Sequence, residues 1–204
     1  MVVALFWLFG NRQKQKRHHE WEVISSEMGL ALFSEDELFQ LRNTLANFVL
    51  LTQGTSPQIT SGMGRQIGAV ELKVFAFEHG RMVDNRIHHY IVAMLTDREL
   101  NLPSFQLRFR DRTHQIIRKI QGGEVFYDAA YPLLSEKYVP MGSFSQLTPH
   151  FLVYCDRLAS HADYPEIEGN YHYLLLFYNR PAKLQTKYVE NAMQELLMAH
   201  KCFN

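Results

Sequence analysis

The chain has 204 residues, a formal net charge of zero and 47% hydrophobic residues. These values exclude a disordered chain and predict a globular domain with a sizeable core. The charge is unevenly distributed, because residues 1–20 hold four Lys/Arg and one acid while residues 21–204 hold 17 bases and 20 acids. A mildly acidic body argues against nucleic-acid binding, which needs basic charge on the folded surface.

The first nineteen residues have the pattern of a segment at a membrane edge. An uninterrupted apolar run over residues 1–10 is followed at once by basic residues, which suits hydrocarbon and then anionic headgroups. The residues expected to contact the membrane are Leu5, Phe6, Trp7, Leu8, Phe9, Arg12, Lys14, Lys16 and Arg17. The charges follow the apolar run, unlike those of a signal peptide. If the run meets a membrane, this order predicts that residues 11–204 lie on the cytoplasmic side; the alternative is a soluble cytoplasmic protein.

The length of this apolar run limits how it can meet a bilayer. Ten helical residues reach ~15 Å, whereas the hydrocarbon layer is ~30 Å thick, so the run cannot span alone. Three interpretations remain: an interfacial anchor, the last part of a spanning helix that starts earlier, or a helix docked on the folded domain. We therefore divide the chain into a membrane-proximal stem, residues 1–19, and a globular domain, residues 20–204.

Helical and extended patterns alternate through the first half of the domain. A short helix is expected over residues 20–28 and a short strand over 30–33. Ser34 and Glu37 form a capping-box pattern that begins a helix reaching Phe48. The glycines at 62, 64 and 68 are interpreted as turn residues, because their spacing fits no nucleotide-binding fingerprint. Residues 69–78 and 87–95 alternate as a long antiparallel hairpin, and residues 102–109 form a further strand.

The second half of the chain predicts a smaller hairpin between helices. Residues 113–120 and 147–158 are expected to be helical. Residues 164–168 and 171–178 form the hairpin, with Gly169 and Asn170 as its turn. The return strand is apolar on both faces, which places it in the centre of the sheet. Pro181 opens a closing helix over 182–200, whose buried stripe is Tyr188, Ala192, Leu196 and Ala199.

This order predicts an α+β fold: a single domain with a mainly antiparallel sheet, a long hairpin, flanking helices and a C-terminal helix packed on the sheet. The chain also resembles a group of uncharacterised bacterial proteins that carry an N-terminal membrane segment, a basic stretch and a cytoplasmic α+β domain. The resemblance lies in Gly29-Leu30, residues 48–54, the 64–75 segment, His89, residues 102–105, residues 131–138 with Gly142, and residues 167–169. It implies no catalytic residues and no cofactor.

Two clusters are candidate contact sites. Arg108, Arg110 and Arg112 recur at every second residue and could contact an anionic headgroup or phosphate; the alternative is an edge strand guarded by charge. The aromatic residues Phe126, Tyr127, Tyr131 and Tyr138 could line a pocket or a protein interface; the alternative is core packing.

Catalytic and metal chemistry have weaker signals. His161 and Asp163 lie close in sequence to His150 and Cys155, but no zinc-ligand spacing is present, and we predict no metal site. Cys155 is interpreted as a buried cysteine and not as a nucleophile. Cys155 and Cys202 form no CxxC pair, which favours a reducing compartment; the alternative is a single long-range disulfide between them. The sequence thus favours a membrane-proximal cytoplasmic binding or scaffold domain with a protein or lipid partner. The alternative is a small hydrolase or transferase that uses a His/acid pair in an aromatic-lined pocket.

Overall fold

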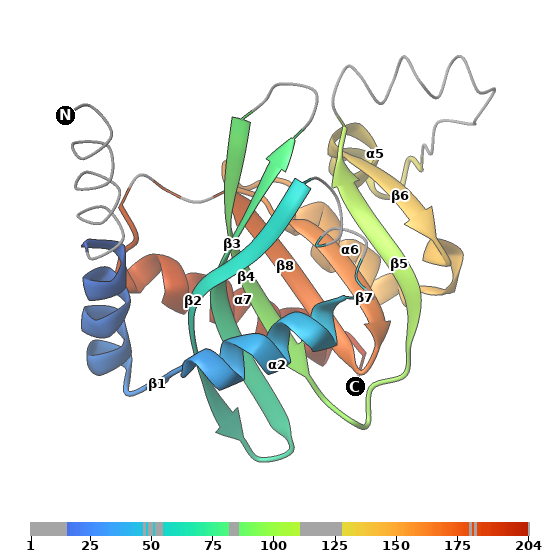
Figure 1. Ribbon diagram of the computed structural model, residues 1–204. Coiled ribbons are helices and arrows are strands. Elements are labelled where there is room, and N and C mark those ends of the chain that lie inside the picture. Colours follow the sequence, from blue (N-terminus) through green and yellow to red (C-terminus); the bar gives the residue numbers. More distant parts are fainter. Residues whose placement is uncertain are drawn as a thin grey trace.

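The computed structural model describes residues 16–46, 48, 51, 55–81, 86–110, 128–179, 181 and 183–203 (Figure 1). Within these ranges eight strands form one antiparallel sheet in the order β1-β2-β3-β4-β8-β7-β5-β6. The strands are β1 (Ala31–Leu32), β2 (Thr55–Ile67), β3 (Val70–Arg81), β4 (Arg86–Thr96), β5 (Leu102–Phe109), β6 (Tyr138–Gly142), β7 (Glu166–Tyr171) and β8 (Tyr173–Asn179).

Helices cover both faces of this sheet. They are a helix over residues 16–28, α2 (Glu35–Leu45), α5 (Pro132–Lys137), the short 3-10 helix η1 (Phe144–Gln146), α6 (Pro149–Leu158) and α7 (Thr186–Lys201). Figure 1 shows α2 in front of the sheet and α7 behind it. The predicted α+β single domain with its C-terminal helix on the sheet is confirmed. The expected helix over 113–120 lies outside the described residues.

Strand β8 explains why the sheet carries two cores. It pairs with β4 on one side and β7 on the other, as its apolar sequence predicted. Leu174 and Leu176 pack into the core under α6 and α7, while Leu175 and Phe177 pack into the core under α2. Because successive strand residues point to opposite faces, a strand buried on both sides is apolar at every position.

The long hairpin and the capping box are also confirmed. Strands β3 and β4 pair along their whole length, from Glu71 opposite Thr96 to Arg81 opposite Arg86. At the start of α2 the Ser34 backbone N–H donates to Glu37 Oε2 (2.8 Å), and the Glu37 N–H donates to Ser34 Oγ (3.3 Å). The Ser34 hydroxyl also donates to Glu37 Oε2 (2.8 Å), and the two bonds that this carboxylate accepts from Ser34 lower its pKa. The box satisfies two backbone donors that the helix cannot.

The predicted turn over residues 64–68 is wrong in extent. Strand β2 continues to Ile67, and only Gly68, with φ of 61°, has the left-handed backbone of a turn. Gly62 and Gly64 lie inside β2, where an added Cβ would come within 2.6 Å and 3.0 Å of the Phe33 ring. These two glycines allow the aromatic ring after β1 to lie against the strand.

The turn of the second hairpin is likewise displaced. Gly169 lies inside β7, and a Cβ there would be 2.2 Å from the Phe105 ring. The chain reverses instead at Tyr171 and His172, with Tyr171 at φ of 49°, a conformation that non-glycine residues rarely adopt. Gly169 therefore allows the Phe105 ring to pack against β7, and the prediction that Gly169 forms the turn is wrong.

The C-terminal end of α7 is fastened to the β4–β5 connection by a buried pair. His200 Nε2 lies 2.7 Å from Asp97 Oδ2, and the Glu99 N–H donates to Asp97 Oδ1 at 2.9 Å. The bond from Glu99, opposed by burial, lowers the pKa of Asp97, and the contact with His200 acts in the same direction. Helix α7 begins at Thr186, four residues later than expected. Its buried stripe is Val189, Ala192, Met193, Leu196 and Ala199, and Tyr188, which was expected in that stripe, is only partly buried.

Candidate ligand site between α6 and α7

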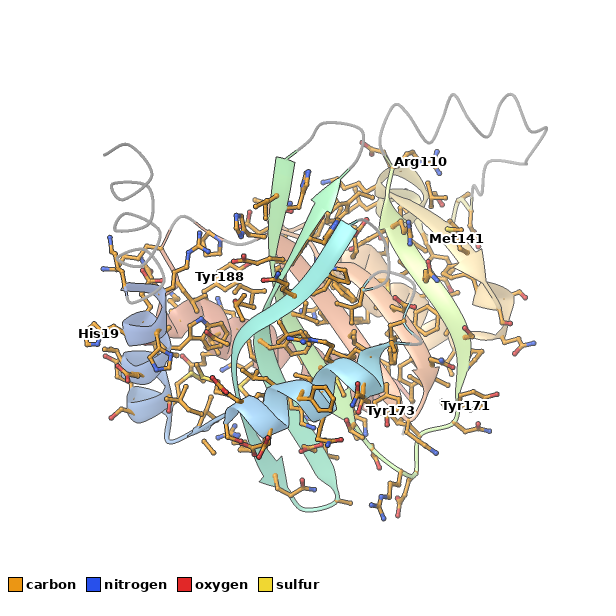
Figure 2. The ribbon with its side chains drawn as sticks, viewed as in Figure 1. His19, Arg110, Met141, Tyr171, Tyr173 and Tyr188 are labelled. Atoms are coloured by element: carbon orange, nitrogen blue, oxygen red, sulfur yellow. The ribbon has the colours of Figure 1, made fainter. Side chains whose placement is uncertain are left out.

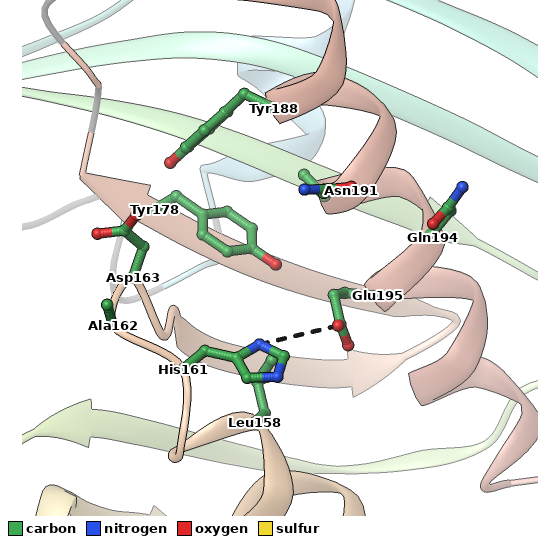
Figure 3. Close-up of a pocket in the computed structure, with 10 residues that line it drawn as sticks. Leu158, His161, Ala162, Asp163, Tyr178, Tyr188, Asn191, Gln194 and Glu195 are labelled. Atoms are coloured by element: carbon green, nitrogen blue, oxygen red, sulfur yellow. Dashed lines mark ion pairs between the residues drawn. The ribbon is translucent and has the colours of Figure 1, made fainter.

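A cavity of about 360 Å³ opens between the end of α6, the loop that follows it, the end of β8 and one face of α7 (Figure 3). This volume lies in the range of small-molecule sites. The residues that line the cavity are Leu158, His161, Ala162, Asp163, Tyr178, Tyr188, Asn191, Ala192, Gln194 and Glu195. We refer to it below as the α6–α7 cleft.

Glu195 is held in place from the α6 side. Its Oε2 atom accepts from the Tyr154 hydroxyl (3.1 Å) and from Arg157 Nη2 (3.3 Å). The Arg157 guanidinium also lies over the Tyr154 ring, 5.4 Å from the centroid. These contacts fix the carboxylate at the wall of the cleft, with the side chain 15% exposed.

His161 faces the other oxygen of the same carboxylate. Its Nδ1 atom lies 3.9 Å from Glu195 Oε1, and its side chain is 46% exposed at the mouth of the cleft. Figure 3 shows the imidazole pointing toward Glu195 from the loop after α6. The structure therefore brings a histidine and an acid together in a concave site, although they are 34 residues apart in the chain.

Tyr178 forms the inner wall. It is 7% exposed, and none of the described residues gives its buried hydroxyl a hydrogen-bond partner. In Figure 3 this hydroxyl is directed toward the side of the cleft where Glu195 lies. Burial raises the pKa of Tyr178, and the negative charge of Glu195 raises it further, so the phenol is neutral.

Tyr188 completes the aromatic part of the cleft. Its ring packs edge-to-face with that of Tyr178, with centroids 5.9 Å apart, and its hydroxyl donates to the Asn179 carbonyl (3.0 Å). Burial raises the pKa of Tyr188, and the charge of Asp163 adds to the effect. Each of the two tyrosines thus lies close to one carboxylate of the cleft.

The cleft offers acid–base and hydrogen-bonding groups, but none of the described residues that line it is a serine, threonine or cysteine. Cys155, on the inner face of α6, is fully buried, and burial raises the pKa of its thiol well above the usual range. It is a core residue, and both cysteines are free thiols. Within the described residues there is no group of three or more His, Cys, Asp or Glu placed to hold a metal ion.

A second cavity of about 280 Å³ lies on the opposite side of α7, against the helix over residues 16–28. Glu27 and Met28 from that helix, Arg65 from β2, and Thr186, Glu190 and Met193 from α7 are among the residues that line it. The Thr186 hydroxyl donates to the Glu27 carboxylate. Helix α7 therefore separates two cavities.

The arginine row does not lie on an edge strand. Strand β5 pairs with β7 on one side and with β6 on the other, so the interpretation of a charged edge is wrong. Arg108 is buried, and its Nε donates to Gln106 Oε1 (3.1 Å). Arg110 follows the end of β5 (Figure 2), and its Nη2 donates to the Tyr138 carbonyl (3.2 Å). Arg112 lies outside the described residues.

Tyr131 and Tyr138, the two predicted aromatic pocket residues that the structure describes, do not line the α6–α7 cleft. Tyr138 is fully buried, and its hydroxyl donates to the Pro165 carbonyl (2.6 Å). Tyr131 is partly buried against the same core, while Phe126 and Tyr127 lie outside the described residues. The cleft uses Tyr178 and Tyr188 instead. The signal on α7 was a spacing: Tyr188, Asn191, Ala192 and Glu195 fall on one helical face.

Most of the expected membrane contacts lie before the described part of the chain, namely Leu5, Phe6, Trp7, Leu8, Phe9, Arg12 and Lys14. Lys16 is exposed at the start of the helix over residues 16–28. Arg17 binds the folded body, because its Nη1 lies 2.8 Å from Glu78 Oε1 on β3. Among the residues that the structure describes, no helix is both long and apolar enough to cross a bilayer.

In comparisons with known proteins, no protein-family model, no curated protein and no solved structure matches this chain.

Proposed function

We propose that this protein is a binding domain that acts next to a membrane and takes a small polar ligand in the α6–α7 cleft. In this proposal the apolar run and the basic residues of the stem contact the membrane, and the domain lies on its cytoplasmic face. The cleft carries the ligand part. A partner protein on the same membrane is compatible with both.

The observation that carries the proposal is the buried hydroxyl of Tyr178. A buried polar group without a partner costs about 1–3 kcal/mol of stability. Folded proteins leave few such groups, and each needs a reason. Tyr178 faces a cavity of ligand size next to a positioned carboxylate, and a hydroxyl that waits for a ligand supplies that reason.

Replacing Tyr178 with phenylalanine should raise the free energy of unfolding of the ligand-free protein by about 1 kcal/mol, because the ring stays and the unsatisfied hydroxyl goes. The matched control is Tyr154→Phe, which changes a buried tyrosine of α6 that contacts Glu195 from outside the lining. Its hydroxyl donates to Glu195, so its loss should lower stability by about 1 kcal/mol. Urea denaturation of both variants measures the difference. A Tyr178→Phe variant less stable than the wild type would show that the hydroxyl has a structural role.

A second candidate function is hydrolysis or group transfer, and the approach of His161 to Glu195 favours it. Because no described lining residue is a serine, threonine or cysteine, His161 would act as general base on a water molecule, and the charge of Glu195 would orient the imidazole. Screening ester and phosphoester substrates tests this. Both His161→Gln and Glu195→Gln should lower any turnover at least about 100-fold, the usual contribution of a general base. His150→Gln, an exposed histidine at the other end of α6, is the control. Activity that survives in both variants rejects this candidate.

A further inference from the structure

The charges that line the α6–α7 cleft have one dominant sign. Asp163 and Glu195 contribute carboxylates, and none of the described residues that line the cavity is a lysine or arginine. Arg157 lies outside the lining. Its Nη2 atom donates to Glu195 Oε2, and its guanidinium lies over the Tyr154 ring. The Oε1 atom faces His161 across 3.9 Å, a gap too long for a hydrogen bond.

The polar groups that surround this carboxylate can accept hydrogen bonds. Glu195 has one oxygen on the cleft side, and the Tyr178 hydroxyl has lone pairs with no described partner. Asn191 adds an amide oxygen from the preceding turn of α7. A group with several donors and a positive charge would satisfy all three at once.

The remaining surface is aromatic and apolar. Tyr178 and Tyr188 meet edge to face, and Leu158 and Ala192 add apolar side chains to the lining. Aromatic rings attract a cation at their faces, and the apolar side chains accept an alkyl chain.

We propose that the α6–α7 cleft binds an alkylammonium ligand, whose ammonium group donates to Glu195, Tyr178 and Asn191 while its chain lies against Tyr188 and Leu158. This inference rests on the proposed function and names its ligand class. An ammonium group has three donors and no acceptor, which matches the acceptors of the wall. An anionic ligand would meet two carboxylates and lose its hydration without compensation.

The test is a titration of the full ¹⁵N-labelled chain with three probes of one shape: butylammonium, butanol and butyrate. The amide signals of Asn191, Ala192, Gln194 and Glu195 report binding. Butylammonium should bind at least about tenfold more tightly than either other probe, a difference of one charge-assisted hydrogen bond. Glu195→Gln and Tyr178→Phe should each weaken butylammonium binding about tenfold.

Two further variants keep the test decisive. Asp163→Asn, in an exposed loop, removes a lining charge with little risk to folding, and should weaken butylammonium binding severalfold. Glu190→Gln is the matched control, because Glu190 lies on the opposite side of α7 in the second cavity. It should leave binding within about twofold, whereas an equal loss in Glu190→Gln and Glu195→Gln would show an effect of net charge alone and overturn the inference.

The probes also separate this inference from the proposed function. If butyrate or butanol moves the reporter signals at lower concentration than butylammonium, the ligand class is wrong and the cleft remains a ligand site. If no probe moves them, both the inference and the ligand part of the proposed function fail. If Glu195→Gln and Asp163→Asn bind butylammonium like the wild type, the inference is rejected.

Discussion

Replacing Arg12, Lys14 and Lys16 together with glutamine should weaken binding of the protein to anionic vesicles about 100-fold. Each basic residue next to an anionic surface contributes about 1 kcal/mol, and 1.4 kcal/mol is a factor of ten. Arg17 is left unchanged, because its ion pair with Glu78 on β3 belongs to the folded domain. Flotation with vesicles of phosphatidylcholine and phosphatidylserine measures the loss.

The control for this experiment is a triple variant of exposed lysines elsewhere. Lys183, Lys187 and Lys201 lie before and along α7, and their replacement by glutamine changes the net charge equally. This control should float like the wild type, and binding of the wild type should fall with added salt because exposed charges are screened. A stem variant that floats as well as the control would remove the membrane part of the proposed function.

Trp21→Ala should lower the free energy of unfolding by about 3–5 kcal/mol, the usual cost of removing a buried tryptophan side chain. Trp21 is fully buried on the helix over residues 16–28, where it packs with Ile24 into the core behind the sheet. The substitution leaves a large void, and the neighbouring side chains close it only in part. Urea unfolding followed by far-UV circular dichroism gives the value.

Val23→Ala, on the same helix, provides the comparison. Val23 is 41% exposed, so its truncation should change stability by no more than about 0.5 kcal/mol. If Trp21→Ala costs as little as Val23→Ala, the helix is not docked as described. In that case the stem would be joined to the domain by a loosely held segment.

The elements that sequence predicted best were those fixed by local chemistry. The capping box at Ser34 and the alternation along β3 and β4 depend on neighbours within a few residues. The doubly apolar pattern of β8 also identified its central place. Such signals are short-range, and they fix an element before its tertiary partners are known.

The roles of the glycines were harder to predict, because a glycine can be required either by a turn or by the close packing of another side chain. Gly62, Gly64 and Gly169 suggested turns, but each makes room for an aromatic ring that comes from elsewhere in the chain. No local pattern names Phe33 or Phe105 as the partner. The sequence therefore identified these positions as structurally constrained, but the predicted cause, a turn, was wrong.

The candidate site was predicted only in part, for the same reason. His161 and Asp163 were noticed as a pair of potential ligands, but Glu195 joins them from a helix that arrives through the packing of α7 on the sheet. Tyr178 carried no signal of its own, because its position in a central strand reads as core. Only the fold shows that the last residue of that buried run meets a cavity.

Helix α7 lies between the α6–α7 cleft and the helix over residues 16–28, so it connects these two parts of the molecule. One of its faces supplies Glu195 to the cleft, and another supplies Thr186 and Met193 to the junction with the segment that continues from the stem. If a bound molecule tilts this helix, the junction shifts with it, and if the junction is displaced, the shape of the cleft changes. By reciprocity of coupled equilibria, lipid contact and occupancy of the cleft would then change each other's affinity by the same factor.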